Sequence, residues 1–121
     1  MGDPEPPPYR PVMPSLHIEH AITDLATWTA AYGAFADVRR RSGVTSETVR
    51  HPVDDPGFVV IDLEFGTVEQ ARDFLRFLET QVWASRERSP ALGGTPAVRI
   101  LEPVALTGLP PQPPGGGPKA T

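Results

Sequence analysis

The clearest pattern of hydrophobic and polar positions lies in Gly57–Gly66, with the sequence GFVVIDLEFG. Successive side chains of a strand point to opposite faces, so a strand here has one wholly apolar face and one mixed face. The apolar face carries Val59, Ile61, Leu63 and Phe65. The mixed face carries Phe58, Val60, Asp62 and Glu64. This pattern predicts a strand in the middle of the sheet of a small α+β domain.

Three other segments also have strand patterns. The alternation at Ser15–Ile22 predicts a strand whose two faces differ. One face carries Leu16, Ile18, His20 and Ile22, and the other carries His17, Glu19 and Ala21. Val44–Val53 is rich in Thr and Val and precedes the turn sequence DDPG. Ala97–Val104 is the fourth predicted strand, and Pro103 within it indicates an edge strand or a strand end.

The first predicted helix runs from Leu25 to about Ser42. Thr23 and Asp24 precede it as N-cap candidates, and Gly43 follows it as a C-terminal stop. Its stripe, at three- and four-residue steps, consists of Leu25, Trp28, Tyr32, Phe35 and Arg39.

The second predicted helix runs from Val68 to about Ala84, and Thr67 with Gln70 fits a capping box at its start. Its stripe consists of Ala71, Phe74, Leu75, Leu78 and Val82, with Phe77 and Trp83 beside it. Ser85–Thr95 is predicted to be a loop. The order of elements, βαββαβ, predicts a ferredoxin-like α+β fold: a four-stranded antiparallel sheet with two helices on one face.

Composition sets the limits of this domain. Six of the 16 prolines lie in residues 1–14 and five lie after Leu109. We therefore predict a folded domain at residues 15–106, with disordered Pro-rich or Pro/Gly-rich tails at 1–14 and 107–121.

The chain has 121 residues and no cysteine, which excludes disulfides, thiolate catalysis and Cys-ligated metals.

Charge and hydropathy exclude two classes of partner. The net charge is −4, and the basic residues cluster only at Arg39, Arg40 and Arg41, so nucleic-acid binding is not expected. These arginines are predicted to face solvent at the end of the first helix. No apolar run approaches the length of a membrane span, and the N-terminus lacks a signal-peptide pattern. We expect a cytoplasmic protein.

Two groups of side chains suggest chemistry. On the face covered by helices, His20 would lie near Trp28, Tyr32 and Trp83. A buried imidazole among aromatic rings suits a general base, because burial lowers its pKa. The alternative is a core histidine with one hydrogen-bond partner, packed against structural aromatic residues.

The second group lies on the opposite face and consists of His17, Glu19, Asp62 and Glu64. These residues would suit a divalent metal, or they would form a polar network at an interface, with Arg50 or Arg99 pairing the acids. His51, beside Pro52, is predicted to be exposed. The chain contains no phosphate-binding loop, GxSxG or HExxH motif.

Several segments together resemble the dimeric α/β-barrel superfamily, especially its small antibiotic-biosynthesis-monooxygenase proteins. They are HIEHAITDLATW at His17–Trp28, SGV at Ser42–Val44, DDPG at Asp54–Gly57, VVIDLEF at Val59–Phe65 and the Glu-x-Ala-Arg run at Glu69–Arg72. The resemblance implies a homodimer with face-to-face sheets and a ligand pocket between each sheet and its helices. In that family, cofactor-independent monooxygenases bind aromatic polyketides and use Asn, Trp or His side chains.

Two functions remain open. One is a cofactor-independent monooxygenase or cyclase acting on an aromatic or polyketide-like molecule. It would have His20 as the catalytic residue, would bind its substrate through Trp28, Tyr32 and Trp83, and would hold no metal or cofactor. The other is a non-catalytic ligand-binding or accessory homodimer, which the absence of Asn and the loop Ser85–Thr95 favour. An apolar cavity of about 300 Å³ or more beside His20 would favour a ligand, whereas a filled core would exclude the enzyme.

Overall fold

The computed structural model describes residues 13–105. Most of both predicted tails, and Leu106 at the end of the predicted domain, therefore lie outside the described residues. Pro14, which the sequence pattern placed in the N-terminal tail, is fully buried. Its carbonyl accepts a hydrogen bond from the Phe65 N–H at 2.9 Å. Pro14 therefore packs with the domain, although it lies one residue before the predicted boundary at Ser15.

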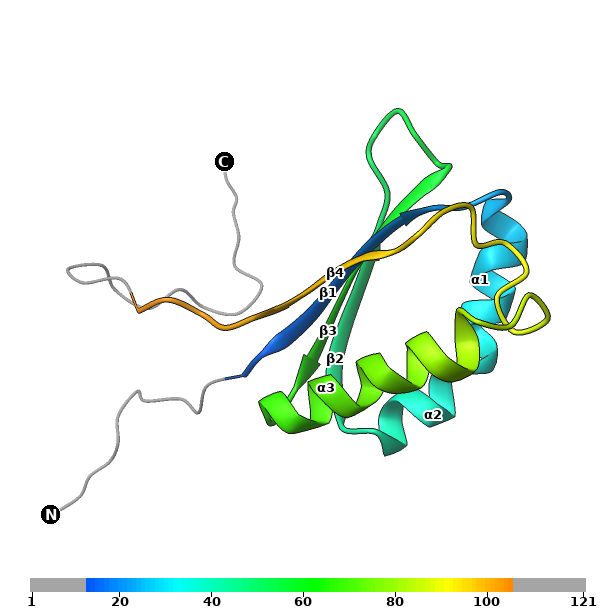
Figure 1. Cartoon of the computed structure of the whole chain (residues 1–121). Coiled ribbons are helices and arrows are strands. Elements are labelled where there is room, and N and C mark those ends of the chain that lie inside the picture. Colours follow the sequence, from blue (N-terminus) through cyan, green and yellow to red (C-terminus); the bar gives the residue numbers. More distant parts are fainter. Residues whose placement is uncertain (1–12, 106–121) are drawn as a thin grey trace, which may run out of the picture.

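The core of the protein is one four-stranded antiparallel sheet (Figure 1). Its strands are β1 (Ser15–Ala21), β2 (Val44–Arg50), β3 (Phe58–Phe65) and β4 (Ala97–Leu101). The spatial order is β2-β3-β1-β4, so β3, the strand predicted in the middle of the sheet, is central together with β1. β2 and β4 are shorter than predicted and end at Arg50 and Leu101. Each predicted strand extended past a proline, Pro52 or Pro103, which has no N–H to donate to a neighbouring strand.

Helices cover one face of this sheet (Figure 1). They are α1 (Leu25–Ala34), α2 (Ala36–Arg41), α3 (Val68–Phe77) and the π-helical turn η1 (Leu78–Val82). With the strand order, this arrangement is a ferredoxin-like α+β fold, as predicted. No helix within residues 13–105 has the length and apolar character needed to cross a membrane.

The predicted helix boundaries follow local capping chemistry. The Thr27 N–H donates to the Asp24 carboxylate at 2.8 Å, and Thr67 and Gln70 form the reciprocal capping box. Gly43 ends α2 with a φ of 105°, a left-handed conformation that favours glycine.

The helix interiors differ from the prediction in two places. The single helix expected from Leu25 to Ser42 is broken at Phe35, whose φ and ψ are −101° and 14°. There the Tyr32 carbonyl accepts from the Phe35 N–H at 3.2 Å and from the Arg39 guanidinium at 2.6 Å. The second expected helix changes to π geometry after Phe77, where the Trp83 N–H donates to the Leu78 carbonyl at 2.7 Å.

The buried core lies between the sheet and the helices, and the predicted strand faces are confirmed. Its largest buried apolar side chains from β1 and β3 are Leu16, Ile18, Val59, Ile61, Leu63 and Phe65. His20 shares this face and is 4% exposed. No helix of residues 13–105 covers the opposite face of the sheet, which we call the open face (Figure 1).

Candidate functional site

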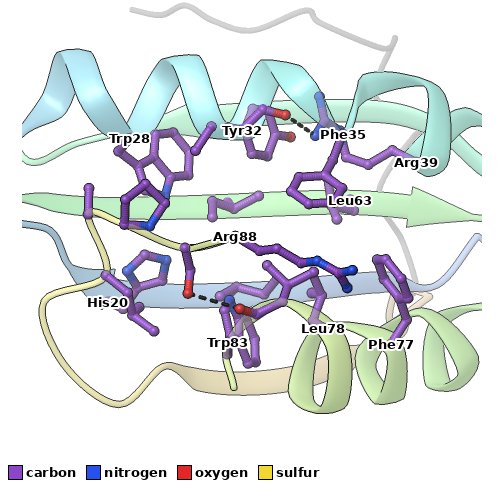
Figure 2. Close-up of a pocket in the computed structure, with 18 of the residues that line it drawn as sticks. His20, Trp28, Tyr32, Phe35, Arg39, Leu63, Phe77, Leu78, Trp83 and Arg88 are labelled. Carbon is purple, nitrogen blue, oxygen red and sulfur yellow. Dashed lines mark hydrogen bonds between the residues drawn. The ribbon is translucent and has the colours of Figure 1, made fainter. Parts of the chain in front are cut away.

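A cavity of about 70 Å³ lies between the sheet and the helices (Figure 2). All four predicted site residues line it: His20 from β1, Trp28 and Tyr32 from α1, and Trp83 just after η1. Most of the remaining wall is apolar. It includes Ile18, Phe35, Ile61, Leu63, Phe74, Phe77, Leu78 and Val82.

The size of this cavity falls between the two outcomes expected from the sequence. The core is not filled, but 70 Å³ is well below the roughly 300 Å³ typical of a ligand pocket. The empty space rises to about 650 Å³ when the open solvent at the mouth of the cavity is included. Phe35 and Phe77 are only half-buried and Arg88 is exposed. A ligand would therefore have to displace side chains at the mouth.

His20 presents one free ring nitrogen. Its Nδ1 lies 2.9 Å from the Ala21 carbonyl oxygen. Because a carbonyl only accepts, Nδ1 must carry the proton. Burial lowers the pKa of His20, opposed by the weaker effect of this hydrogen bond, so the ring is neutral near pH 7. Nε2 then keeps its lone pair, and no residue of the described chain donates to it.

Aromatic rings form the wall next to His20. Trp28 and Tyr32, one helical turn apart on α1, stack with centroids 4.8 Å apart and planes at 20°. The ring centroids of Trp28 and His20 lie 6.3 Å apart with the planes at 63°, an edge-to-face arrangement. Figure 2 shows Trp83 on the other side of the cavity from Trp28. These rings provide flat apolar surfaces beside one basic nitrogen.

The prediction that Arg39 faces solvent is wrong. It was expected in solvent with Arg40 and Arg41, which are exposed and pair with Asp37. Arg39 itself is 5% exposed and lines the cavity. The signal was present in the sequence, because Arg39 continues the helical stripe of Tyr32.

Arg39 is held by Tyr32 and Glu47. Its guanidinium carbon lies 3.6 Å from the centroid of the Tyr32 ring. Its Nε lies 2.8 Å from the Glu47 carboxylate; this contact is an ion pair, because the N–H does not point at the oxygen well enough for a hydrogen bond. The Tyr32 hydroxyl donates to the same carboxylate. Burial, and then this hydrogen bond, raise the pKa of Tyr32, so the phenol stays protonated.

The loop after η1 supplies part of the wall that the sequence did not indicate. Arg88 and Ser89 both line the cavity. The Arg88 guanidinium donates to the Gln81 backbone carbonyl at 3.0 Å, and Ser89 Oγ donates to the Val82 carbonyl at 2.9 Å. A loop has no periodic pattern, so its inward positions could not be identified from the sequence.

On the open face, three of the four predicted polar residues, His17, Glu19 and Asp62, form a network with Arg50. His17 Nδ1 lies 2.7 Å from Asp62, and its Nε2 lies 2.8 Å from Glu19. Hydrogen bonds to Glu19 and then Asp62 raise the pKa of His17, and Arg50 pairs with Asp62 at 3.0 Å. Both ring nitrogens of His17 therefore already have carboxylate partners. Residues 13–105 contain no group of three His, Asp or Glu side chains with metal-binding geometry.

Comparison with known proteins shows similarity of fold. No family profile and no curated protein match the chain. A Bordetella bronchiseptica protein assigned as an antibiotic biosynthesis monooxygenase is 16% identical, with a TM-score of 0.60 over 77% of this chain and 98% of that one. A Streptomyces coelicolor monooxygenase in complex with nanaomycin D is 19% identical, with a TM-score of 0.55 over 83% and 94%.

A dimeric ferredoxin-like protein from an uncultured marine organism is 13% identical, with a TM-score of 0.51 over 76% and 96%. These comparisons support the predicted resemblance, and at such identities they show a shared fold.

Proposed function

We propose that this protein binds an aromatic or polyketide-like molecule in the cavity and acts on it as a cofactor-independent monooxygenase or cyclase-like enzyme. The observation that carries the proposal is the free Nε2 of neutral His20 in a cavity walled by Trp28, Tyr32 and Trp83. The nanaomycin D complex of a protein with the same fold lends support.

The proposed chemistry begins with His20 as general base. Nε2 removes a proton from an acidic C–H or O–H of the bound aromatic, which leaves a delocalised anion. For oxygenation at an aryl methylene, this anion passes one electron to O₂, and the carbon radical and superoxide combine to a peroxide anion. The protonated His20 returns its proton to this anion, which gives a hydroperoxide. Loss of water then converts the methylene carbon to a carbonyl. Overall, one oxygen atom enters the product and the other leaves as water with both methylene hydrogens.

An anthrone is a suitable probe, because its methylene is acidic and its oxidation to an anthraquinone is visible by absorbance. We expect the protein to accelerate O₂ uptake above the rate without protein, and His20→Gln to reduce that acceleration at least about 100-fold, the contribution typical of a general base. His51→Gln is the matched control, because His51 is exposed outside the cavity. Acceleration that survives in His20→Gln would refute the role of His20.

A non-catalytic ligand-binding protein is the second candidate. The absence of Asn and the small volume of the cavity favour it. Binding of the anthrone with no acceleration of O₂ uptake would support this candidate over the enzyme.

We also propose a homodimer through the open sheet face. Phe58 and Val60 lie on that face and are only half-buried in the isolated chain. An isologous interface would bury them twice and enclose the His17 network. One protein of similar fold is dimeric.

A further inference from the structure

The charges around the cavity are one-sided. Its lining includes two arginines, Arg39 and Arg88, and no Asp or Glu. His20 adds no charge, because its ring is neutral. The whole chain has a net charge of −4, so this positive lining runs against the overall balance. A cavity of this kind favours an anion.

The two arginines are not equivalent. Arg39 is compensated by the Glu47 carboxylate at 2.8 Å. The guanidinium of Arg88 contacts only neutral acceptors, the backbone carbonyl of Gln81 at 3.0 Å and its side-chain oxygen at 3.5 Å. No carboxylate of residues 13–105 lies within 4 Å of Arg88. Within residues 13–105, Arg88 therefore has no ion-pair partner, and its chain neighbour Glu87 is exposed to solvent.

Arg88 also lies where a ligand would enter. A groove on the surface between α1 and the loop shares four lining residues with the cavity: Ala31, Phe35, Arg88 and Pro90. These residues form the boundary between the groove and the cavity. Ser85 Oγ accepts the Arg88 N–H at 3.1 Å, which anchors the backbone. Figure 2 shows the Arg88 side chain between the rings of Tyr32 and Phe35 on one side and those of Phe77 and Trp83 on the other.

We propose that the ligand is an aromatic carboxylic acid. Its ring lies against Trp28 and Tyr32, and its carboxylate accepts hydrogen bonds from Arg88 at the mouth. A carboxylate fits better than a phosphate dianion, because Arg88 is the one cation among the described residues of the lining that has no ion-pair partner. This inference rests on the proposed function and adds the chemical class of the ligand.

Calorimetric titration with 2-naphthoate and 2-naphthamide tests this assignment. The two probes have nearly the same shape and differ in charge. We expect the full-length protein to bind naphthoate about tenfold more tightly, as for one charge-assisted hydrogen bond at a partly exposed site. Arg88→Gln should remove this preference by weakening naphthoate alone. Arg86→Gln is the matched control, because Arg86 is exposed and does not line the cavity.

The outcomes separate this inference from the proposed function. Equal affinity for both probes, or a naphthoate preference that survives in Arg88→Gln, overturns the aromatic-acid assignment and leaves ligand binding intact. Failure of the full-length protein to bind either probe overturns both. Because Arg88 is exposed, Arg88→Gln should unfold at the same temperature as the parent, so loss of preference cannot come from misfolding.

Discussion

Replacing Glu47 by Gln should destabilise the protein far more than its exposed position suggests. The Arg39 side chain is 6% exposed and its ion pair with Glu47 is 2.8 Å long. Removing one partner of a fully buried pair costs about 3–5 kcal/mol, because the other charge stays buried and unpaired. The Glu47 side chain is 41% exposed, so water screens part of this loss. Arg39 also keeps its contacts with the Tyr32 carbonyl and ring. We therefore expect a loss of about 2 kcal/mol.

Chemical denaturation of Glu47→Gln measures this loss directly, and thermal unfolding should show a decrease of about 4–8 °C per kcal/mol. Glu79→Gln is the matched control, since Glu79 is exposed and makes no ion pair within residues 13–105. Adding Arg39→Met should recover part of the stability, because it removes the unpaired charge. A cost for Glu47→Gln no larger than that for Glu79→Gln would refute the view that Arg39 depends on this carboxylate.

Three further predictions concern other parts of the fold. Glu19 and Asp62 raise the folded-state pKa of His17, so the stability that the protonated ring contributes should be fully present below pH 6.5 and be lost as the pH rises through the raised pKa. Denaturation measured across this pH range should show the loss, and His17→Gln should remove it. Gly43→Ala should cost at least about 1 kcal/mol, because φ is 105° and the new Cβ would lie 2.6 Å from Gln70; an unchanged denaturation midpoint would contradict this. Light scattering at micromolar concentration should give twice the chain mass, and a monomer would rule out the proposed dimer.

For β1 and β3, the alternation of residue types was enough to predict which side of the sheet each side chain faces. Side chains alternate strictly along a strand, so the apolar set of Val59 and Ile61 determines the direction of every neighbour. The same rule placed His20 toward the helices and His17 on the open face. Helix caps such as Asp24 could also be predicted from the sequence, because the capping hydrogen bond joins residues only three positions apart.

The surroundings of the site residues, by contrast, could be read only from the folded structure. Arg39 is buried because Tyr32 and Glu47, from a helix and a neighbouring strand, together offer it a ring and a carboxylate. The break at Phe35 accompanies that arrangement, since Arg39 bonds the Tyr32 carbonyl where the helix is interrupted. Arg88 reaches the cavity from an aperiodic loop. The partners of these side chains come from segments far apart in the chain, and no local pattern encodes them.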